Sequence, residues 1–292
     1  ITVNDITNPT ASDPPPISVE CLSDVPAPDV SVVTDAADNC TVSPVVAWEN
    51  DSSDGNTCPE TITRTYSVTD DCGNSINVEQ VITVHDMTAP TASDPPTTSY
   101  QCGSDVPPPD ISVVTDAADN CGPPVVAFVS ESNDGNTCPE TITRTYSVTD
   151  ACGNSINVQH QIIVNDLVNP VISNCPADIT VSADPASCDA TVNWTEPTAT
   201  DNCILADFSS SHSPGSVFPI GTSTVTYTAT DDCGNTATCS FNVNVIDDEP
   251  PVITACATDK TLSADNNCEV QVPDLTVEVS ATDNCSPPVI IS

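Results

Sequence analysis

The feature that most constrains this chain is an internal repeat of about 80 residues. Residues 54–70 reappear unchanged as residues 134–150. Four cysteines of one copy recur in the next, each 80 or 81 residues later: Cys21, Cys40, Cys58 and Cys72, followed by Cys102, Cys121, Cys138 and Cys152. Because neighbouring copies share sequence and spacing, we expect each to fold into the same small domain.

An aspartate followed four residues later by a proline marks the end of each copy. This junction recurs at Asp5, Asp86, Asp166 and Asp247. It divides the chain into the last strand of a preceding repeat (1–5), two similar repeats (6–86 and 87–166), a diverged third repeat (167–247) and a truncated fourth repeat (248–292). We therefore interpret the chain as a window from a longer tandem array.

Each repeat contains short segments in which Val, Ile and Thr alternate with polar residues. In the first repeat these segments are 17–21, 29–33, 44–50, 61–70 and 75–86, and turns rich in Pro, Asp, Asn and Gly separate them. None has the periodicity of a helix. The pattern predicts an all-β chain of tandem immunoglobulin-like β-sandwich domains in an extended array.

Aromatic residues recur at two positions, and we expect both sets in the core. One set lies in a central strand, the other in the penultimate strand: Trp48, Phe128 and Trp194, then Tyr66, Tyr146 and Tyr227. Arg64 and Arg144 are the basic residues of their repeats and share strand parity with the tyrosines. We expect each arginine to form a half-buried ion pair with a nearby acid rather than to recognise a ligand.

The net charge of −39, from 42 acidic and 3 basic residues, excludes several classes of partner. Nucleic acids and anionic membrane surfaces are both recognised through Lys and Arg, which this chain nearly lacks. It also has no apolar run of about 18 residues that could span a bilayer. Disorder is disfavoured because 38% of the residues are hydrophobic and alternate in strand-like segments.

The 16 cysteines indicate the compartment. No C-x-x-C pair occurs and there are 3 histidines, so the spacing of zinc ligands is missing. Disulfides are the better interpretation, and they persist in oxidising surroundings. We therefore expect a secreted, extracellular or cell-surface protein whose secretion signal and anchor lie outside these residues.

Residues 169–251 carry the segment NPVISNCPADITVS, a DNC at 201–203, a TDDCGN at 230–235 and the junction VIDDEPP. In this pattern they resemble the HYR (hyalin repeat) module. The first two repeats share the DNC, the TD-x-CGN and the junction, and they resemble the Asp- and Thr-rich repeats of giant secreted surface adhesins of bacteria. The resemblance implies an immunoglobulin-like fold and a role in extracellular adhesion, and it implies no catalytic residues.

The strand order of such a sandwich suggests which cysteines meet. Loops B–C and F–G lie at one pole, and loops A–B and E–F lie at the other. This topology predicts disulfides within each domain: Cys21–Cys58, Cys40–Cys72, Cys102–Cys138, Cys121–Cys152, Cys203–Cys233 and Cys175–Cys239. Cys188 is left over, while Cys256, Cys268 and Cys285 find partners outside the chain or stay unpaired.

Aspartates recur at three positions that this topology places at the joint between consecutive domains. Carboxylates that converge there suit Ca²⁺, which takes about 6–8 oxygen ligands. The candidate ligands are Asp5, Asp35, Asp38, Asp70, Asp86, Asp116, Asp119, Asp150, Asp166, Asp201, Asp231, Asp247 and Asp283. The alternative is that these residues form Asx turns or solvated surface without a metal.

No catalytic constellation is visible, because the chain has no G-x-S-x-G, H-E-x-x-H or glycine-rich phosphate loop. We expect a non-catalytic structural and adhesive segment of a long extracellular stalk or filament. Its partners would be neighbouring repeats of the same chain, and a distal tip would bind surface glycans, proteins or other copies in a fibre. The alternatives are a passive spacer in a large secreted enzyme or binding protein, and a lectin-like binder.

Overall fold

The computed structural model describes residues 4–285. The outermost residues of the first and last predicted segments, 1–3 and 286–292, lie outside this range. The chain divides into two compact units. Unit 1 comprises Ile1–Tyr100, Val106–Asn136 and Glu140–Val164, and unit 2 comprises Gln101–Asp105, Thr137–Pro139 and Asn165–Ser292.

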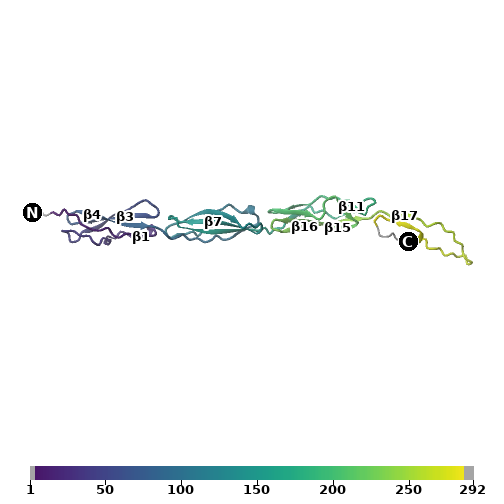
Figure 1. Cartoon of the computed structure of the whole chain (residues 1–292), viewed down its shortest axis with the longest axis horizontal. Coiled ribbons are helices and arrows are strands. Elements are labelled where there is room, and N and C mark those ends of the chain that lie inside the picture. The colour runs from purple at the N-terminus through teal and green to yellow at the C-terminus, as the bar shows by residue number, and fades with distance from the viewer. Residues whose placement is uncertain (1–3, 286–292) are drawn as a thin grey trace. The chain divides into compact units, whose positions relative to one another are not determined.

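Unit 1 contains a four-stranded sheet built from the first repeat (Figure 1). Its strands are β1 (Ile17–Val19), β2 (Val45–Ser53), β3 (Glu60–Thr69) and β4 (Ser75–Val84), in the order β1-β4-β3-β2. β1 runs parallel to β4, and the other neighbours are antiparallel. The alternating Val, Ile and Thr residues favour this sheet because branched side chains pack well on a pleated surface.

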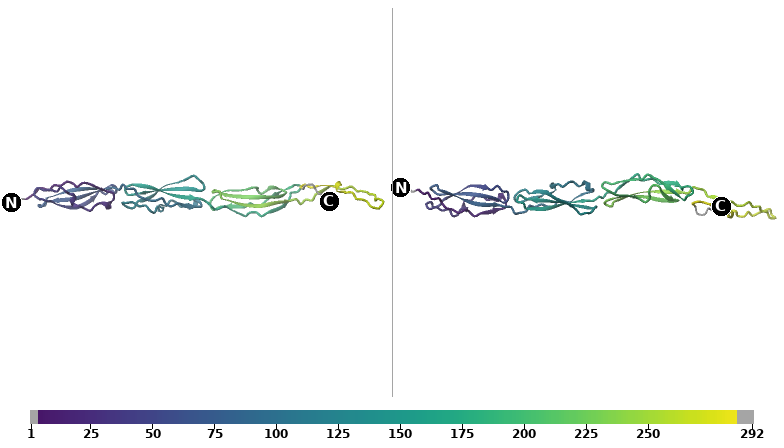
Figure 2. Two further views of the ribbon diagram at one scale, coloured as in Figure 1. Left: turned by 90° about the horizontal axis from the view of Figure 1, so that it is seen from below. Right: turned by 45° about the horizontal axis from the view of Figure 1, so that its top comes forward.

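The second repeat forms another four-stranded sheet of the same topology, which is teal in Figure 2. Its strands are β5 (Thr98–Tyr100), β6 (Val125–Asn133), β7 (Glu140–Thr149) and β8 (Ser155–Val164), in the order β5-β8-β7-β6. The registers of the two sheets match residue for residue along the long β3–β4 and β7–β8 hairpins. The sequence identity of the two repeats therefore extends to their structure.

The layer that covers the first sheet is mostly irregular chain rather than a regular second sheet. It contains two short 3-10 turns, η1 (Leu22–Asp24) and η2 (Val30–Val32), and a single bridge between Thr10 and Ala37. The second repeat has the same arrangement, with the turn η4 (Ile111–Val113) and a bridge between Thr91 and Ala118.

The expected strand over 29–33 is therefore wrong. The Asp29 carboxylate accepts a hydrogen bond from the Ser31 backbone N–H at 2.9 Å, which starts a 3-10 turn instead of a strand. Asp favours such local turns because its short side chain reaches the backbone two residues on. Val33, at the end of the turn, is still buried.

The core of the first repeat lies between this layer and the sheet. Tyr66 and Val68 of β3 are fully buried, and they pack with Val33 and with Val78 of β4. Tyr146 and Tyr227 are likewise buried in the second and third repeats. The prediction that these tyrosines are core residues is confirmed.

The prediction for the other aromatic set is wrong in the first two repeats. Trp48 is 47% exposed and Phe128 is 42% exposed. Both lie on an edge strand, β2 or β6, which has a hydrogen-bonded neighbour on one side only. Phe128 still contacts Tyr146 edge to face, with ring centroids 5.8 Å apart. Trp194 is partly buried and packs on the core of the third repeat.

Arg64 occupies an inward position of β3 and is almost completely buried. Its guanidinium forms a two-pronged ion pair with Asp51 of β2, with N–O distances of 2.9 and 2.8 Å, and also donates to the Pro26 carbonyl. Arg144 repeats this in the second repeat with Glu131 at 2.6 Å. Each arginine therefore has an acidic partner, as predicted.

Unit 2 contains a four-stranded sheet from the third repeat, drawn in green in Figure 1. Its strands are β10 (Ile179–Ser182), β13 (Leu205–Ser210), β15 (Gly221–Asp231) and β16 (Thr236–Ile246), in the order β10-β16-β15-β13. β10 runs parallel to β16, as β1 does to β4 in the first repeat.

The third repeat also has two regular strand pairs beside this sheet. β11 (Asp189–Val192) pairs with β14 (Ser216–Pro219), and β9 (Val171–Ser173) pairs with β12 (Thr198–Thr200). They enclose one large hydrophobic cluster that includes Phe218. The third repeat has more of its residues in strands than the first two repeats, because these strand pairs replace the irregular layer that covers the sheet in those repeats.

Beyond the third repeat, unit 2 continues into one further strand pair. β17 (Val252–Ala255) pairs with β18 (Ser280–Thr282), and a 3-10 turn, η5 (Thr276–Glu278), precedes β18. The residues between these strands, 256–279, contain no other regular element. The described part of the fourth repeat thus retains a pair of its strands.

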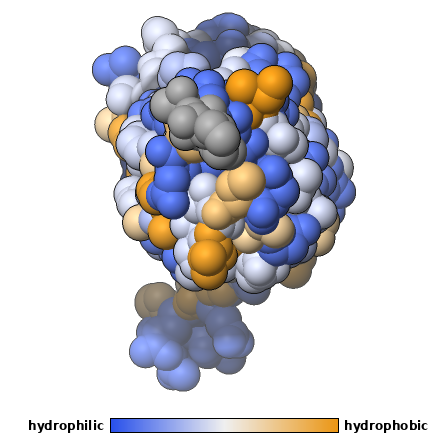
Figure 3. Space-filling view, turned by 90° about the vertical axis from the view of Figure 1, so that its left-hand side faces the viewer, coloured by the Kyte–Doolittle hydropathy of each residue, from blue (hydrophilic) through white to orange (hydrophobic). Residues whose placement is uncertain are grey.

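The fold is all-β, with tandem β-sandwich-like domains, as the alternation of the sequence predicts. Within residues 4–285, no helix is long and apolar enough to cross a membrane. Figure 3 shows hydrophilic residues over most of one face, with hydrophobic residues in small separate groups. That distribution is typical of an ordinary exposed surface.

Candidate functional site

The described residues contain five disulfides, and four of them join different repeats. The pairs are Cys21–Cys121, Cys58–Cys152, Cys102–Cys203, Cys138–Cys233 and Cys175–Cys239. All have Cα–Cα distances between 4.9 and 6.0 Å, within the range that a disulfide spans. The expected pairs within domains are therefore wrong for Cys21–Cys58, Cys40–Cys72, Cys102–Cys138, Cys121–Cys152 and Cys203–Cys233.

In unit 1, two disulfides hold the first repeat to the second. Strand register explains the geometry: Glu60 of β3 pairs with Val84 of β4, so Cys58 lies at the end of the sheet where β4 runs into the junction. Cys21 follows β1, which runs parallel to β4 and ends at the same place. The partners Cys121 and Cys152 lie in the loops before β6 and between β7 and β8.

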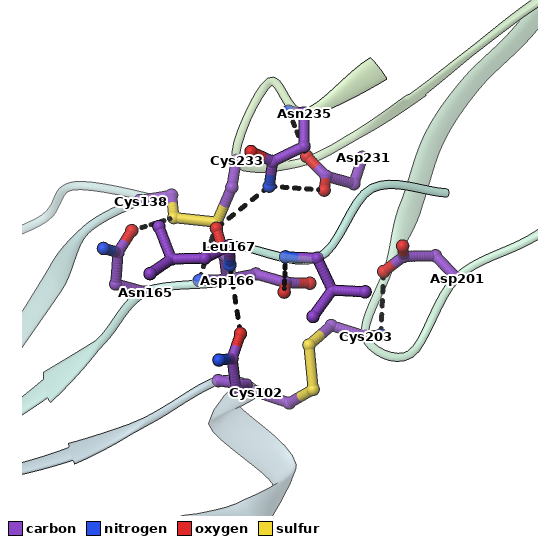
Figure 4. Close-up of a disulfide and its surroundings, with 12 residues drawn as sticks. Cys102, Cys138, Asn165, Asp166, Leu167, Asp201, Cys203, Asp231, Cys233 and Asn235 are labelled. Atoms are coloured by element: carbon purple, nitrogen blue, oxygen red, sulfur yellow. Dashed lines mark hydrogen bonds between the residues drawn. A yellow bond between two sulfur atoms is a disulfide. The ribbon is translucent and has the colours of Figure 1, made fainter. Parts of the chain in front are cut away.

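In unit 2, two loops of the second repeat are bonded to the third repeat in the same way (Figure 4). Cys102 is bonded to Cys203, and Cys138 is bonded to Cys233. A fifth disulfide, Cys175–Cys239, lies within the third repeat and is the only one of the five that does not join repeats.

The expected pairing failed because each repeat presents two cysteines at each pole. The two cysteines at one pole could bond to each other or to the cysteines at the facing pole of the next domain. The cysteine spacing and the strand order are compatible with both schemes. One signal in the sequence favoured the second scheme. The third repeat has five cysteines, so pairing within domains leaves Cys188 without a partner.

Six cysteines carry free thiols in the structure. Cys40 and Cys72 are exposed and occupy the positions that Cys121 and Cys152 hold in the next repeat. The others are Cys188, Cys256, Cys268 and Cys285.

An asparagine reinforces each joint by hydrogen bonding to the junction backbone. Asn154 donates through Nδ2 to the Asp86 carbonyl at 3.0 Å, and Asn235 donates to the Asp166 carbonyl at 2.9 Å. Asn74 makes the equivalent bond to the Asp5 carbonyl at 3.1 Å. The asparagine of the TD-x-CGN motif therefore ties the domain to the segment that enters it, a role that sequence reasoning did not assign.

A second asparagine acts on the side chain of the junction aspartate. Asn202 donates through Nδ2 to both carboxylate oxygens of Asp166, at 3.2 and 3.3 Å. Asp166 is 2% exposed. In unit 1, Asn120 makes a longer contact of 3.5 Å with Asp86, which is also buried. The DNC asparagine thus solvates a buried carboxylate at each joint.

The aspartates of the loops form Asx turns, as the alternative interpretation holds. Asp70 accepts hydrogen bonds from the backbone N–H groups of Cys72 and Asn74, both at 2.8 Å. Burial acts to raise the pKa of Asp70, but the hydrogen bonds from Asn74 and its neighbours outweigh it and lower that pKa. Asp150 behaves identically in the second repeat.

The structure also brings some of the predicted ligands together. Asp5, Asp38 and Asp70 offer carboxylate oxygens that lie within 4.8 Å of one another. Asp86 meets Asp119, and Asp166 meets Asp201, each beside a cysteine that is bonded in a disulfide. Four of these residues each have one buried carboxylate oxygen without a hydrogen-bond donor: Asp5, Asp38, Asp119 and Asp201.

Other predicted ligands lie elsewhere. Asp35 and Asp116 are exposed and accept hydrogen bonds from the backbone N–H groups of Ser12 and Ser93, so they do not join the joint clusters. Asp150 and Asp231 are at the joint but outside the clusters. Asp247 precedes the last strand pair and Asp283 follows it. Asp247 accepts a hydrogen bond from the Glu249 backbone N–H, and Asp283 accepts one from the Cys285 backbone N–H.

A cleft of about 420 Å³ opens at the joint of unit 1. Disulfide sulfurs and acidic side chains line it, including those of Glu20, Glu60, Asp86 and Asp119. The rest of the lining is largely apolar and includes Leu22, Val84 and Pro123. The acidic side chains of this cleft disfavour binding of an anion.

Comparison with protein families identifies the domains. An HYR domain matches residues 165–245, and an HYR-like domain with 4 cysteines matches residues 9–84 and 90–164. Together these matches account for most of the chain. The second of these models covers more than half of the chain, which therefore belongs to the family of HYR-like domains with 4 cysteines.

Curated relatives include two hyalins. Hyalin of Strongylocentrotus purpuratus is 35% identical over 185 residues, which cover 60% of this chain and 15% of that protein. Hyalin of Lytechinus variegatus is 35% identical over 190 residues, which cover 60% of this chain and 34% of that protein. The chain thus spans a minor part of each relative.

A third relative is the rat sushi, von Willebrand factor type A, EGF and pentraxin domain-containing protein 1. It is 43% identical over 97 residues, which cover 32% of this chain and 3% of that protein. These relatives are animal proteins. The expectation of a bacterial surface adhesin therefore stays a prediction.

Solved structures that align with this chain include cadherins. Drosophila N-cadherin EC1-3 aligns with 82% of this chain and 100% of that chain, at a TM-score of 0.35 and 13% identity. The extracellular domain of protocadherin GammaB4 aligns with 68% of this chain and 39% of that chain, at a TM-score of 0.30 and 15% identity.

Proposed function

We propose that this chain is a non-catalytic segment of a long extracellular adhesive stalk or filament, in which disulfides couple each repeat to the next. Its location would be secreted or on the cell surface, where the bonds form and persist. The segments 1–5, 6–86, 87–166, 167–247 and 248–292 are its proposed units. Membership of a family that includes the hyalin relatives supports this function.

The observation that carries the proposal is the pair of disulfides at each joint. A single disulfide would still allow one domain to rotate relative to the next. Two disulfides at separate points restrict this rotation as well as the separation of the two domains. In unit 1 the two bonds attach to Cys121 and Cys152, which lie in different loops. A chain linked in this way would transmit tension through covalent bonds even where a domain opens.

The same logic extends to Cys40 and Cys72. These exposed thiols have the positions of Cys121 and Cys152, and the neighbouring Asn74 makes the same junction contact as Asn154. We propose that Cys40 and Cys72 also bond to cysteines of another repeat, at the positions that Cys21 and Cys58 hold in the first repeat. The partners of the segment are therefore first of all other repeats of its own kind.

We also propose that the carboxylates at the joints bind Ca²⁺. Asp86 and Asp119, with the equivalent Asp166 and Asp201, would supply oxygen ligands at the two bonded joints. The buried Asp119 and Asp201 oxygens without donors fit a cation, because a buried carboxylate oxygen is costly to leave unpaired. Bound Ca²⁺ would neutralise the paired carboxylates and stiffen the joint.

Small-angle X-ray scattering on the whole chain tests the coupling. We expect a variant with Cys21→Ser and Cys58→Ser to show a broader distribution of interatomic distances than the wild type. A matched control, Cys175→Ser with Cys239→Ser, removes a disulfide within one repeat and should lower thermal stability without broadening that distribution. Identical distributions for the wild type and the joint variant would refute a stiffening role.

The spacer function keeps specific support from the rat relative, a multidomain protein of which this chain matches 3%. A spacer and an adhesive segment would share the same joints. They differ in whether the repeats contact a surface ligand. A cell-binding assay separates the adhesive segment from the spacer. It compares the binding of the full-length protein to cells before and after deletion of the residues outside this segment.

A further inference from the structure

Two free cysteines of unit 2 approach each other at the joint between the third repeat and the last strand pair. The Cys188 thiol donates to the Asn284 carbonyl at 2.7 Å, and the Cys285 thiol donates to the Ser187 carbonyl at 3.1 Å. Each sulfur therefore lies against the residue that precedes the other cysteine.

Cys285 occupies the receiving position of the bonded joints. It ends a DNC motif, as Cys121 and Cys203 do, and both of those accept a disulfide from the preceding repeat. Its backbone N–H donates to Asp283 at 2.9 Å, which matches the Cys203 bond to Asp201 at 2.9 Å. Cys285 and the bonded Cys203 therefore share the DNC motif and the same hydrogen bond from the cysteine N–H to the aspartate of that motif.

Cys188 occupies the position from which the preceding repeat supplies its cysteine. It follows β10, which runs parallel to the last strand of its sheet, just as Cys102 follows β5. Cys102 also lies 3.5 Å from the carbonyl of Asn202, the residue before its partner, and Cys188 makes the same approach to Asn284. At both sites, therefore, the sulfur of the preceding repeat lies against the carbonyl of the residue before the receiving cysteine.

We propose that Cys188 and Cys285 form a further disulfide, which couples the third repeat to the fourth. A small-molecule disulfide of the secretory compartment, such as oxidised glutathione, would be the oxidant. One cysteine attacks it as the thiolate, forming a mixed disulfide and releasing one glutathione thiol. The other cysteine then attacks the mixed disulfide, which joins the two Sγ atoms and releases the second glutathione thiol.

This bond explains why the third repeat has an odd number of cysteines. Cys175 and Cys239 pair within it, Cys203 and Cys233 bond to the second repeat, and Cys188 is the remaining one. Coupling of successive repeats thus continues past the change from the four-cysteine type to the HYR type, with one bond at the joint. Formation of the Cys188–Cys285 bond does not depend on whether the segment is adhesive.

The single lysine of the chain permits a direct test. Lys260 lies between the two cysteines, so a lysine-specific protease cuts once and separates residues 1–260 from 261–292. The intact chain is secreted or refolded with oxidised and reduced glutathione, its thiols are blocked at acid pH, and it is then digested in urea. We expect the short fragment to stay attached on a non-reducing denaturing gel and to be released by reductant.

Two variants identify the bond. Cys285→Ser should release the fragment without reductant, whereas Cys268→Ser, which removes the other cysteine of the fragment, should leave it attached. Cleavage before aspartate should then yield one linked peptide pair, residues 184–188 with residues 283–292. Release of the fragment from the fully folded wild type, or its retention in Cys285→Ser, would overturn the proposal.

Discussion

Cys58, in the loop before β3, is bonded to Cys152 in the second repeat, 94 residues further along the chain. The Cys21–Cys121 bond accompanies it with a separation of 100 residues. In the chain-entropy model, closing a loop of about 100 residues contributes about 4–5 kcal/mol, more than a shorter bond within one domain. The joints are therefore covalent and stabilise both of the repeats that they connect.

The single methionine gives a direct test of this pairing. Met87 lies at the junction of the first two repeats, so cyanogen bromide in acid separates residues 1–87 from 88–292. We expect the two fragments to remain together on a non-reducing gel and to separate after reduction. The Cys21→Ser, Cys58→Ser variant should separate without reductant. Separation of the wild-type fragments without reductant would instead support disulfides within domains.

The buried ion pair of the first repeat should be measurable as stability. Arg64→Val removes a charged hydrogen-bond partner of Asp51, and we expect the free energy of unfolding to fall by about 1–3 kcal/mol. Adding Asp51→Ser should recover part of this loss, because it removes the unpaired carboxylate. Valine suits the site, since the third repeat has the fully buried Val225 at this position.

A surface pair serves as the control for Arg64. Lys260 and Glu278 form an ion pair in which both side chains are about one-third exposed. Lys260→Met should change stability by less than about 1 kcal/mol, because exposed pairs are screened by water. Chemical denaturation of the variants measures both effects, and equal losses for the two sites would contradict the role assigned to burial.

His160 predicts a dependence of stability on pH in the second repeat. Burial, and then the positive charge of Arg144, lower the pKa of His160 below its ordinary value of 6.5. The unfolded chain therefore binds the proton more readily than the folded chain. Stability from this residue is complete above pH 6.5 and is lost as the pH falls below 6.5 toward the lowered pKa.

Substitution by the residue of the first repeat should remove this dependence. Gln80 occupies the same place in β4 and donates to the Pro15 carbonyl at 3.1 Å without titrating. We expect His160→Gln to flatten the change in melting temperature between pH 7 and about pH 5. His85→Gln, at an exposed site, is the control and should leave the slope as in the wild type.

Calcium should raise the melting temperature if the joint carboxylates bind it. At a free concentration 100 times the dissociation constant, one site adds about 2.7 kcal/mol. Asp86→Asn with Asp119→Asn should reduce the difference between millimolar Ca²⁺ and EDTA. Asp35→Asn with Asp116→Asn, outside the clusters, should preserve it. A wild-type melting temperature that is the same in Ca²⁺ and EDTA would refute the metal site.

Much of the fold could be predicted from local pattern. Alternation along 61–70 predicted β3 with its buried Tyr66, because side chains on one face of a strand share one environment. It also placed Arg64 among those inward residues, where only an acidic partner makes burial tolerable. It failed for 29–33, where the Asp29 side chain competes for the backbone and a 3-10 turn results.

The sequence by itself determined the repeat, its strands and the pole at which each cysteine lies, since all three depend on spacing along one domain. Only the tertiary structure decided that Cys58 bonds to Cys152 rather than to Cys21. A disulfide requires two Cα atoms within about 7 Å, and that distance depends on how the end of one domain meets the start of the next. The cysteine spacing within a repeat carries no information about that contact.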